Sequence, residues 1–424
     1  MQKYNFDELI PRRGSGCVKW DEMSFDDLIP LWVADMDFAV APAIQEAIRR
    51  RAEHPVYGYT HVGDEYYEAV VSWFRRRHQW DILHGDCKSP QAEILYTTGV
   101  VPAMSVAIKA LTMPGEKVLI LSPDYNCFFS SIRNNGCEVL ESALVSEELR
   151  VKSEEFATAV PSGEDLAAAN SSLFTLHFSL NWEDFESCCA DEKTTVFLLC
   201  NPHNPTGRVW TAEELSRMND ICLRHGVRVV SDEIHCELVM PGHRFQPFAA
   251  VSEDCRRNSV ILNSPSKSFN IAGLQTANII CSDPAVRRRL ERAININEVC
   301  DLNPFGPVAL VAAYNESEDW IDQLNDYLWG NYLALRQFFA EHLPQCRVTE
   351  LEGTYLVWVD VSVLSDNVQQ LCDHLLREAH VWVNPGTMYG PQTGEGYIRI
   401  NIACPRSLLM EGLRRILSVI KPEV

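Results

Sequence analysis

The chain has 424 residues, of which 46% are hydrophobic and 22% are charged, a composition typical of a globular protein with two or three structural domains. Its net charge of −21 argues against nucleic acid as a partner, because phosphate backbones require a basic surface. The apolar runs are too short to span a bilayer, and MQKYNFDELIPRR lacks the pattern of a secretory signal. We therefore expect a cytoplasmic protein with no membrane partner.

The cysteines predict a reducing environment. There are fifteen, scattered and often inside apolar runs, where a free thiol behaves as a small hydrophobic side chain. No C-x-x-C pair occurs, and Cys188 and Cys189 have no companion ligands at zinc-site spacing. We expect reduced core cysteines and no metal site.

Helical and strand patterns alternate from about residue 41. Residues 41–54 and 64–78 have amphipathic helical spacing, and Pro42 stands where a helix start tolerates proline. Residues 212–226 form another helical pattern, with Gly226 as its stop. Short apolar strands lie between such helices: EILYTT, KVLIL, CEVLE, TVFLLC, VRVVSD, SVILN and ANIIC. This alternation predicts an α/β fold with an open, mostly parallel sheet covered on both faces.

The pattern changes after about residue 300. A long helical stretch over 319–342 leads to the strand YLVWVDV, a helix, the strand YIRINIA and a closing helix. We expect residues 1–45 to join a small α+β domain formed by 300–424, and residues 46–299 to form a large α/β domain. Within the large domain, residues 142–172 are polar and are expected to form a long surface excursion between two strands.

Four predicted strands are followed by residues that can bind a ligand at one edge of the sheet. Gly99 precedes a helix whose free N–H groups suit a phosphate, and Asn204 lies in the turn NPHNPTG. Asp232 ends a buried strand, where a carboxylate is costly without a cation. Lys267 follows in SPSKSFNIAG and is either a loop lysine or a nucleophilic amine. Taken singly, each residue also fits an ordinary turn or loop.

Together and in this order, NPHNPTG, SDEIH and SPSKSFNIAG resemble the fold-type I pyridoxal-phosphate (PLP) enzymes of the class I/II aminotransferase superfamily over almost the whole chain. LWVADMDF, YGYT, TGVVPA and YIRINIACPR narrow the resemblance to the MalY/PatB-type cystathionine β-lyase branch. The resemblance implies a PLP-dependent transferase-like fold with a seven-stranded-type central sheet. It also implies pyridoxal 5'-phosphate as cofactor, a small sulfur amino acid as substrate, and a homodimer with its sites at the interface.

The resemblance also implies site roles. Lys267 would hold the cofactor as a Schiff base and shuttle the substrate's Cα proton, and Asp232 would keep the pyridine nitrogen protonated. Asn204 would bind the phenolic oxygen, Tyr125 would stack on the ring, and Arg399 would bind the substrate carboxylate. For Arg399, a strand arginine paired with a surface acid is the ordinary alternative. The implied phosphate contacts are Gly99, Val100, Val101, Ser264 and Ser266. His235 stands at a cofactor-binding position where many aminotransferases carry a tyrosine, and Gln275 stands where some carry an arginine. A catalytic, cofactor-binding Tyr59, or else Tyr57, would reach the site from the neighbouring subunit.

The activity implied is cleavage of L-cystathionine or related cysteine S-conjugates to pyruvate, ammonia and a thiol, which is homocysteine when cystathionine is cleaved. A class I/II aminotransferase is the alternative, because both reactions begin with removal of the same Cα proton. A non-catalytic regulatory protein of the same fold is a third possibility, and the presence of Asp232, Lys267 and Arg399 argues against it.

Overall fold

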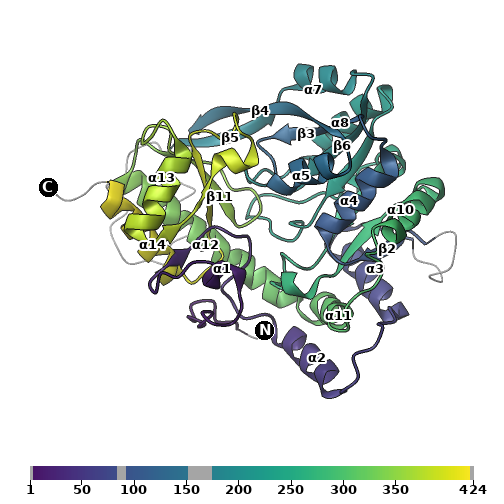
Figure 1. Ribbon diagram of the computed structural model, residues 1–424, viewed down its shortest axis with the longest axis horizontal. Helices are drawn as coiled ribbons and strands as arrows, with labels where there is room; N and C mark the ends of the chain where they lie inside the picture. Colours follow the sequence, from purple (N-terminus) through teal and green to yellow (C-terminus); the bar gives the residue numbers. More distant parts are fainter. Residues whose placement is uncertain (1–2, 84–91, 151–173, 421–424) are drawn as a thin grey trace.

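The computed structural model describes residues 3–83, 92–150 and 174–420, and its largest element is an eight-stranded mixed sheet (Figure 1). The strand order is β2-β9-β8-β7-β6-β3-β4-β5. The run from β8 to β4 is parallel, while β9 and β5 are antiparallel to their neighbours. The bounds are β2 Ile94–Thr97, β3 Lys117–Ser122, β4 Glu138–Arg150, β5 Phe174–Leu180, β6 Thr194–Cys200, β7 Arg228–Asp232, β8 Ser259–Asn263 and β9 Ala277–Ile280. The predicted α/β class and mostly parallel sheet are confirmed.

Two features of this sheet differ from the predictions. It has eight strands rather than the seven implied by the resemblance, because β5 pairs with β4 at one edge. The excursion expected over residues 142–172 is also partly wrong. Its first part, to Arg150, belongs to the thirteen-residue strand β4, and residues 151–172 lie outside the described residues.

Helices cover both faces of the sheet because its strands alternate their apolar side chains between two cores. In β3, Val118 and Ile120 pack on one face, and Leu119 and Leu121 pack on the other. The first face is covered by α4, α5 and α10. These three helices have the bounds α4 Val100–Leu111, α5 Asn126–Asn134 and α10 Pro284–Ile296. The other helices of this part of the chain belong to the second core, and α2 packs on α11: α2 Pro42–Glu53, α3 Asp64–His78, α7 Trp182–Cys189, α8 Ala212–Arg224, α9 Glu253–Asn258 and α11 Gly306–Glu316.

A second, antiparallel sheet follows in the C-terminal part of the chain, on the left in Figure 1. Its order is β10-β11-β14-β13, with β10 Arg347–Val348, β11 Leu356–Asp360, β14 Tyr397–Asn401 and β13 Asn384–Pro385. The helices of this region are α12 Glu318–His342, α13 Val368–His374 with its continuation Leu375–Ala379, and α14 Arg406–Ile420. The predicted helix over 319–342 and the two long strands are confirmed.

The N-terminal segment joins this second unit. After the short helix α1 (Val18–Asp21), strand β1 (Ile29–Pro30) pairs in parallel with β12 (Val381–Trp382). The division of the chain at residues 45 and 299 stays a prediction. Among the described residues, the cysteines are free and no helix is both long and apolar enough to cross a membrane.

Candidate active site

A cavity of about 340 Å³ lies where five strands of the large sheet end. The residues that follow β2, β3, β6, β7 and β8 meet there because parallel strands place their carboxyl ends at one edge. The predicted residues that line it are Gly99, Val100, Val101, Tyr125, Asn204, Asp232, His235, Ser266 and Lys267. Residues up to 168 positions apart in the sequence, from Gly99 to Lys267, are therefore brought together.

Lys267 lies in the turn after β8, and its Nζ donates a hydrogen bond to the carbonyl oxygen of Ala34 at 2.5 Å. Burial lowers the pKa of the Lys267 amine to about 8, with Arg399 acting in the same direction and the carboxylates of Asp35 and Asp232 opposing it. A lysine with this pKa is partly unprotonated near neutral pH, which a nucleophile and proton carrier requires.

Asp232 is the last residue of β7 and is 3% exposed. Its Oδ1 accepts the backbone N–H of Ile234 at 3.1 Å, and it forms no ion pair within the described part of the chain. Burial raises the pKa of Asp232 to about 7. A cationic group entering the cavity would stabilise the carboxylate and lower this pKa again, so the site suits a protonated ring nitrogen.

His235 presents a second unsatisfied polar group to the cavity. Its ring is 3% exposed, and its Nδ1 has no hydrogen-bond partner in the described residues. Burial, with Lys267 and Arg399 adding to it, lowers the pKa of His235 to about 3, so the ring is neutral. A neutral imidazole can donate to or accept from a bound polar group.

Arg399, in the middle of β14, is a buried cation. Its guanidinium donates to Oδ1 of Asn204 at 3.2 Å and to the carbonyl of Trp32 at 2.7 Å, and it lies 4.7 Å from the ring centre of Tyr389. Its Nε has no partner, and no carboxylate of the described residues pairs with it. The surface-acid alternative is therefore wrong, and the geometry suits an anion supplied by a ligand.

The first turn of α4 lines the same cavity with uncapped backbone N–H groups, which are suited to an anion. Gly99 is the N-cap, and no described side chain caps the N–H groups that follow it. Ser266 lines the cavity, but Ser264 does not. The Ser264 hydroxyl donates to the carbonyl of Thr276 at 2.6 Å and accepts the N–H of Ser266 at 3.0 Å.

The three tyrosines predicted from the sequence occupy different positions. Tyr125 lines the cavity at the start of α5, and burial, assisted by Cys127, holds the pKa of its phenol well above the usual range. Tyr59 is 96% exposed and does not line the cavity of its own chain. Tyr57 is less exposed, and its hydroxyl donates to the carbonyl of Ala52 at 2.8 Å.

The structure adds contacts that the sequence did not assign. The additional lining residues include Ala34, Thr98, Cys200 and Ile234, and Gln275 lies there too. Ala34 belongs to LWVADMDF, a segment that carried the resemblance but received no role in the site. Thr98 directly precedes Gly99, so its position beside that predicted turn is the feature of the sequence that could have identified it as a lining residue.

Comparison with known proteins places the whole chain in one family. The model of the family "Aminotransferase class I and II" matches residues 26–416. The chain is 36% identical over 416 residues to cystathionine β-lyase PatB of Bacillus subtilis, covering 97% of this chain and 98% of PatB. It is 31% identical over 424 residues to the protein MalY of Escherichia coli, covering 99% of each.

A solved structure agrees with these relatives. The PLP-bound C–S lyase from Staphylococcus hominis superposes with a TM-score of 0.83 at 30% identity, covering 99% of this chain and 100% of that one. The fold is thus that of the fold-type I PLP enzymes, and the donor set of the cavity fits this cofactor. The chain belongs to the class I and II aminotransferase family and, within it, to the branch of PatB and MalY.

Proposed function

We propose that the protein is a PLP-dependent carbon–sulfur β-lyase. Its substrates are L-cystathionine or related cysteine S-conjugates, and its products are pyruvate, ammonia and a thiol. The observation that carries this proposal is that Lys267 and Asp232 line one cavity and that Arg399, which has no carboxylate partner in the described residues, bonds to the lining residue Asn204, in a chain that matches a cystathionine β-lyase over nearly its full length.

The described residues offer a partner for each polar part of the cofactor. The uncapped N-terminus of α4 and Ser266 suit the phosphate. The Ser264 hydroxyl stabilises the turn by accepting the backbone N–H of Ser266. Asp232 suits the ring nitrogen, Asn204 and His235 suit the phenolic oxygen, and Tyr125 would lie against the ring. Lys267 would be the covalent attachment point. Bound there, pyridoxal phosphate supplies the electron sink that acidifies the substrate's Cα proton.

The chain itself orients the substrate and moves the proton. The Arg399 fork binds the α-carboxylate, and its bond to Asn204 ties the carboxylate site to the cofactor site. Lys267, with a pKa near 8, takes the proton from Cα and can return it. A thiolate on Cβ is then expelled, and water completes the release of pyruvate and ammonia.

A β-lyase and an aminotransferase differ in one simple test. The protein is incubated with L-cystathionine in the absence of a 2-oxo acid, and pyruvate and free thiol are followed together. We expect equal and sustained release of both, abolished in Lys267→Ala and unchanged in Lys193→Ala, which alters an exposed lysine. Amino transfer that begins only when a 2-oxo acid is added would make the protein an aminotransferase.

We propose further that the active form is a homodimer in which Tyr59 completes the neighbouring site. Tyr59 is 96% exposed and the cavity of its own chain lacks it, whereas the Tyr57 hydroxyl is bonded within its own chain. These positions favour Tyr59 over Tyr57 as the residue that reaches the partner's cofactor. A cytoplasmic location and the division into an N-terminal segment, a large domain and a small domain are parts of the same proposal.

A further inference from the structure

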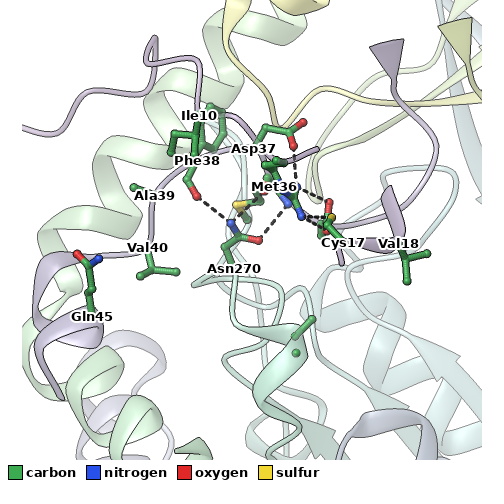
Figure 2. A pocket seen from close by; sticks show the side chains of 14 residues that line it. Ile10, Cys17, Val18, Met36, Asp37, Phe38, Ala39, Val40, Gln45 and Asn270 are labelled. Atoms are coloured by element: carbon green, nitrogen blue, oxygen red, sulfur yellow. Dashed lines mark hydrogen bonds and ion pairs between the residues drawn. The ribbon is translucent and has the colours of Figure 1, made fainter. Parts of the chain in front are cut away.

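The backbone from Trp32 to Phe38, here called the strap, crosses the site without regular secondary structure. Its carbonyl oxygens are held by side chains from distant parts of the fold. Arg399 donates to Trp32 (2.7 Å), Asn401 donates to Val33 (2.7 Å) and Asp35 (2.8 Å), and Asn270 donates to Met36 (3.0 Å) and Phe38 (2.9 Å). Figure 2 shows Asn270 between Met36 and Phe38. The strap is therefore fixed in place although it is neither helix nor strand.

The strap separates two hollows. Ala34 lines the cavity that contains Lys267, whereas Asp35, Met36 and Asp37 line a groove of about 590 Å³ (Figure 2). The Ala34 carbonyl accepts both the Lys267 amine at 2.5 Å and the hydroxyl of Tyr355 at 3.0 Å. The residue next to this acceptor is thus the charged Asp35.

Asp35 is anchored from the groove side by two cations. Its Oδ2 pairs with Arg12 at 2.8 Å, and its Oδ1 lies 3.5 Å from the buried Lys19. Both cations also pair with Asp37, at 2.6 and 2.8 Å. Two carboxylates and two cations therefore balance one another, and their positions are set by the strap and the N-terminal segment.

We propose that Asp35 is a positioning residue for Lys267: with Arg12 and Lys19 it holds the Ala34 carbonyl against the amine and adds a negative charge that keeps a proton on the lysine nitrogen. This inference rests on the proposed function, since it concerns the same lysine. It gives the charged cluster on the groove side of the strap a role in controlling the protonation of Lys267.

The charges around Lys267 make the direction of the effect definite. Burial and Arg399 lower the pKa of Lys267, whereas Asp35 from the strap and Asp232 from β7 raise it, as does Cys127 from α5. The neutral His235 and the Tyr355 hydroxyl complete its surroundings. Removing the Asp35 charge therefore lets the lysine nitrogen lose its proton at lower pH.

The test is a pH titration of the visible absorbance of the cofactor-loaded protein, which reports the proton on the nitrogen that links Lys267 to the cofactor. In Asp35→Asn we expect the midpoint to move down by on the order of one pH unit. Asp37→Asn is the matched control, because it removes a carboxylate from the same cluster that faces Lys19 and Arg12. Its midpoint should stay that of the wild type, and Asp35→Glu should restore the wild-type value.

Arg12→Gln gives a prediction of opposite sign. It removes a cation that offsets the Asp35 charge while Lys19 still anchors Asp35, so the midpoint should move up. This variant decides the question alone if Asp35→Asn does not fold. Equal shifts in Asp35→Asn and Asp37→Asn, no shift in Asp35→Asn, or a downward shift in Arg12→Gln would each overturn the proposal. A wild-type protein that develops no cofactor absorbance would instead contradict the proposed function.

Discussion

Arg399 combines burial with a missing anionic partner. The side chain is 3% exposed, and its contacts are the neutral oxygens of Asn204 and Trp32 and the ring of Tyr389. A buried guanidinium is stable when an anion compensates its charge, so this residue is the strongest single indicator that the ligand carries a carboxylate.

Arg399→Lys should weaken binding of cystathionine selectively. Lysine keeps the charge but cannot present two parallel N–H groups to a carboxylate, so we expect kcat/KM to fall by roughly tenfold to a hundredfold, mainly through KM. The measurement is steady-state pyruvate formation, with cofactor absorbance as a check that the site is still loaded. Arg289→Lys, on the exposed side of α10, is the control and should match the wild type. An unchanged KM in Arg399→Lys would move the carboxylate site elsewhere.

At the scale of single residues, the sequence pattern predicted which side chains at the ends of strands belong to the site. It did not predict the contact that a backbone carbonyl makes with Lys267. Lys267, Asp232 and Asn204 stand directly after apolar runs, and parallel pairing carries such positions to one edge. The Ala34 carbonyl has no residue-type signature, and it lies more than 230 positions from the lysine that it receives. Only the position of the strap in the folded structure shows this contact.

Helix α3 is attached to the loop after β7 through one buried carboxylate. The Oε1 of Glu237 accepts Nε1 of Trp73 at 2.7 Å and lies 2.7 Å from Nε2 of His78, and its Oε2 lies 3.4 Å from Nε of Arg77. Burial on its own would raise the pKa of Glu237, but these partners outweigh it and lower the pKa to about 2. All three partners lie on the last turns of α3.

Glu237→Gln should therefore destabilise the fold at pH 7 by about 3 kcal/mol, because Trp73, Arg77 and His78 lose the buried carboxylate that they share. Since the folded-state pKa is depressed, the stabilisation is fully present above the unfolded value near 4.5 and is lost as pH falls toward 2. Thermal unfolding measured from pH 7 to pH 3 should show a steeper loss for the wild type than for the variant. Glu318→Gln is the control: it removes an exposed carboxylate that pairs with the same Arg77, and it should have little effect on stability. Parallel curves for wild type and Glu237→Gln would contradict this account.

At the scale of elements, period-two and helical patterns predicted seven strands of the large sheet and most helices, whereas the buried strand β5 and β4 beyond Glu141 were not recognised. From Val145 to Leu149 the residues are exposed on both sides of the β4–β5 hairpin. A strand held by backbone hydrogen bonds and exposed on both faces shows no alternation of apolar and polar residues. The polar composition that suggested a loop therefore came from a strand extending beyond the core.

The whole molecule places the site between its two units. The large sheet contributes Lys267 and Asp232, the second sheet contributes Arg399, and the strap from the N-terminal segment bonds to both Lys267 and Arg399. Ser264 lies behind the cavity lining, bonded to Ser266, whereas the predicted Tyr59 is exposed at the surface of its own chain, which points to a contribution from a second copy of the chain.

A complementation experiment tests that contribution. Lys267→Ala and Tyr59→Ala chains are co-expressed with different tags, and the heterodimer is isolated. Each homodimer lacks a required group in both sites, but a two-fold heterodimer has one site with both defects and one with neither. It should therefore show about half the wild-type rate of pyruvate release. Tyr57→Phe should remain active on its own, because the hydroxyl of Tyr57 is bonded within its own chain. A heterodimer as inactive as its parents would mean that Tyr59 serves its own chain, and a fully active Tyr59→Ala homodimer would mean that it serves no site. A monomeric active protein would exclude the shared site altogether.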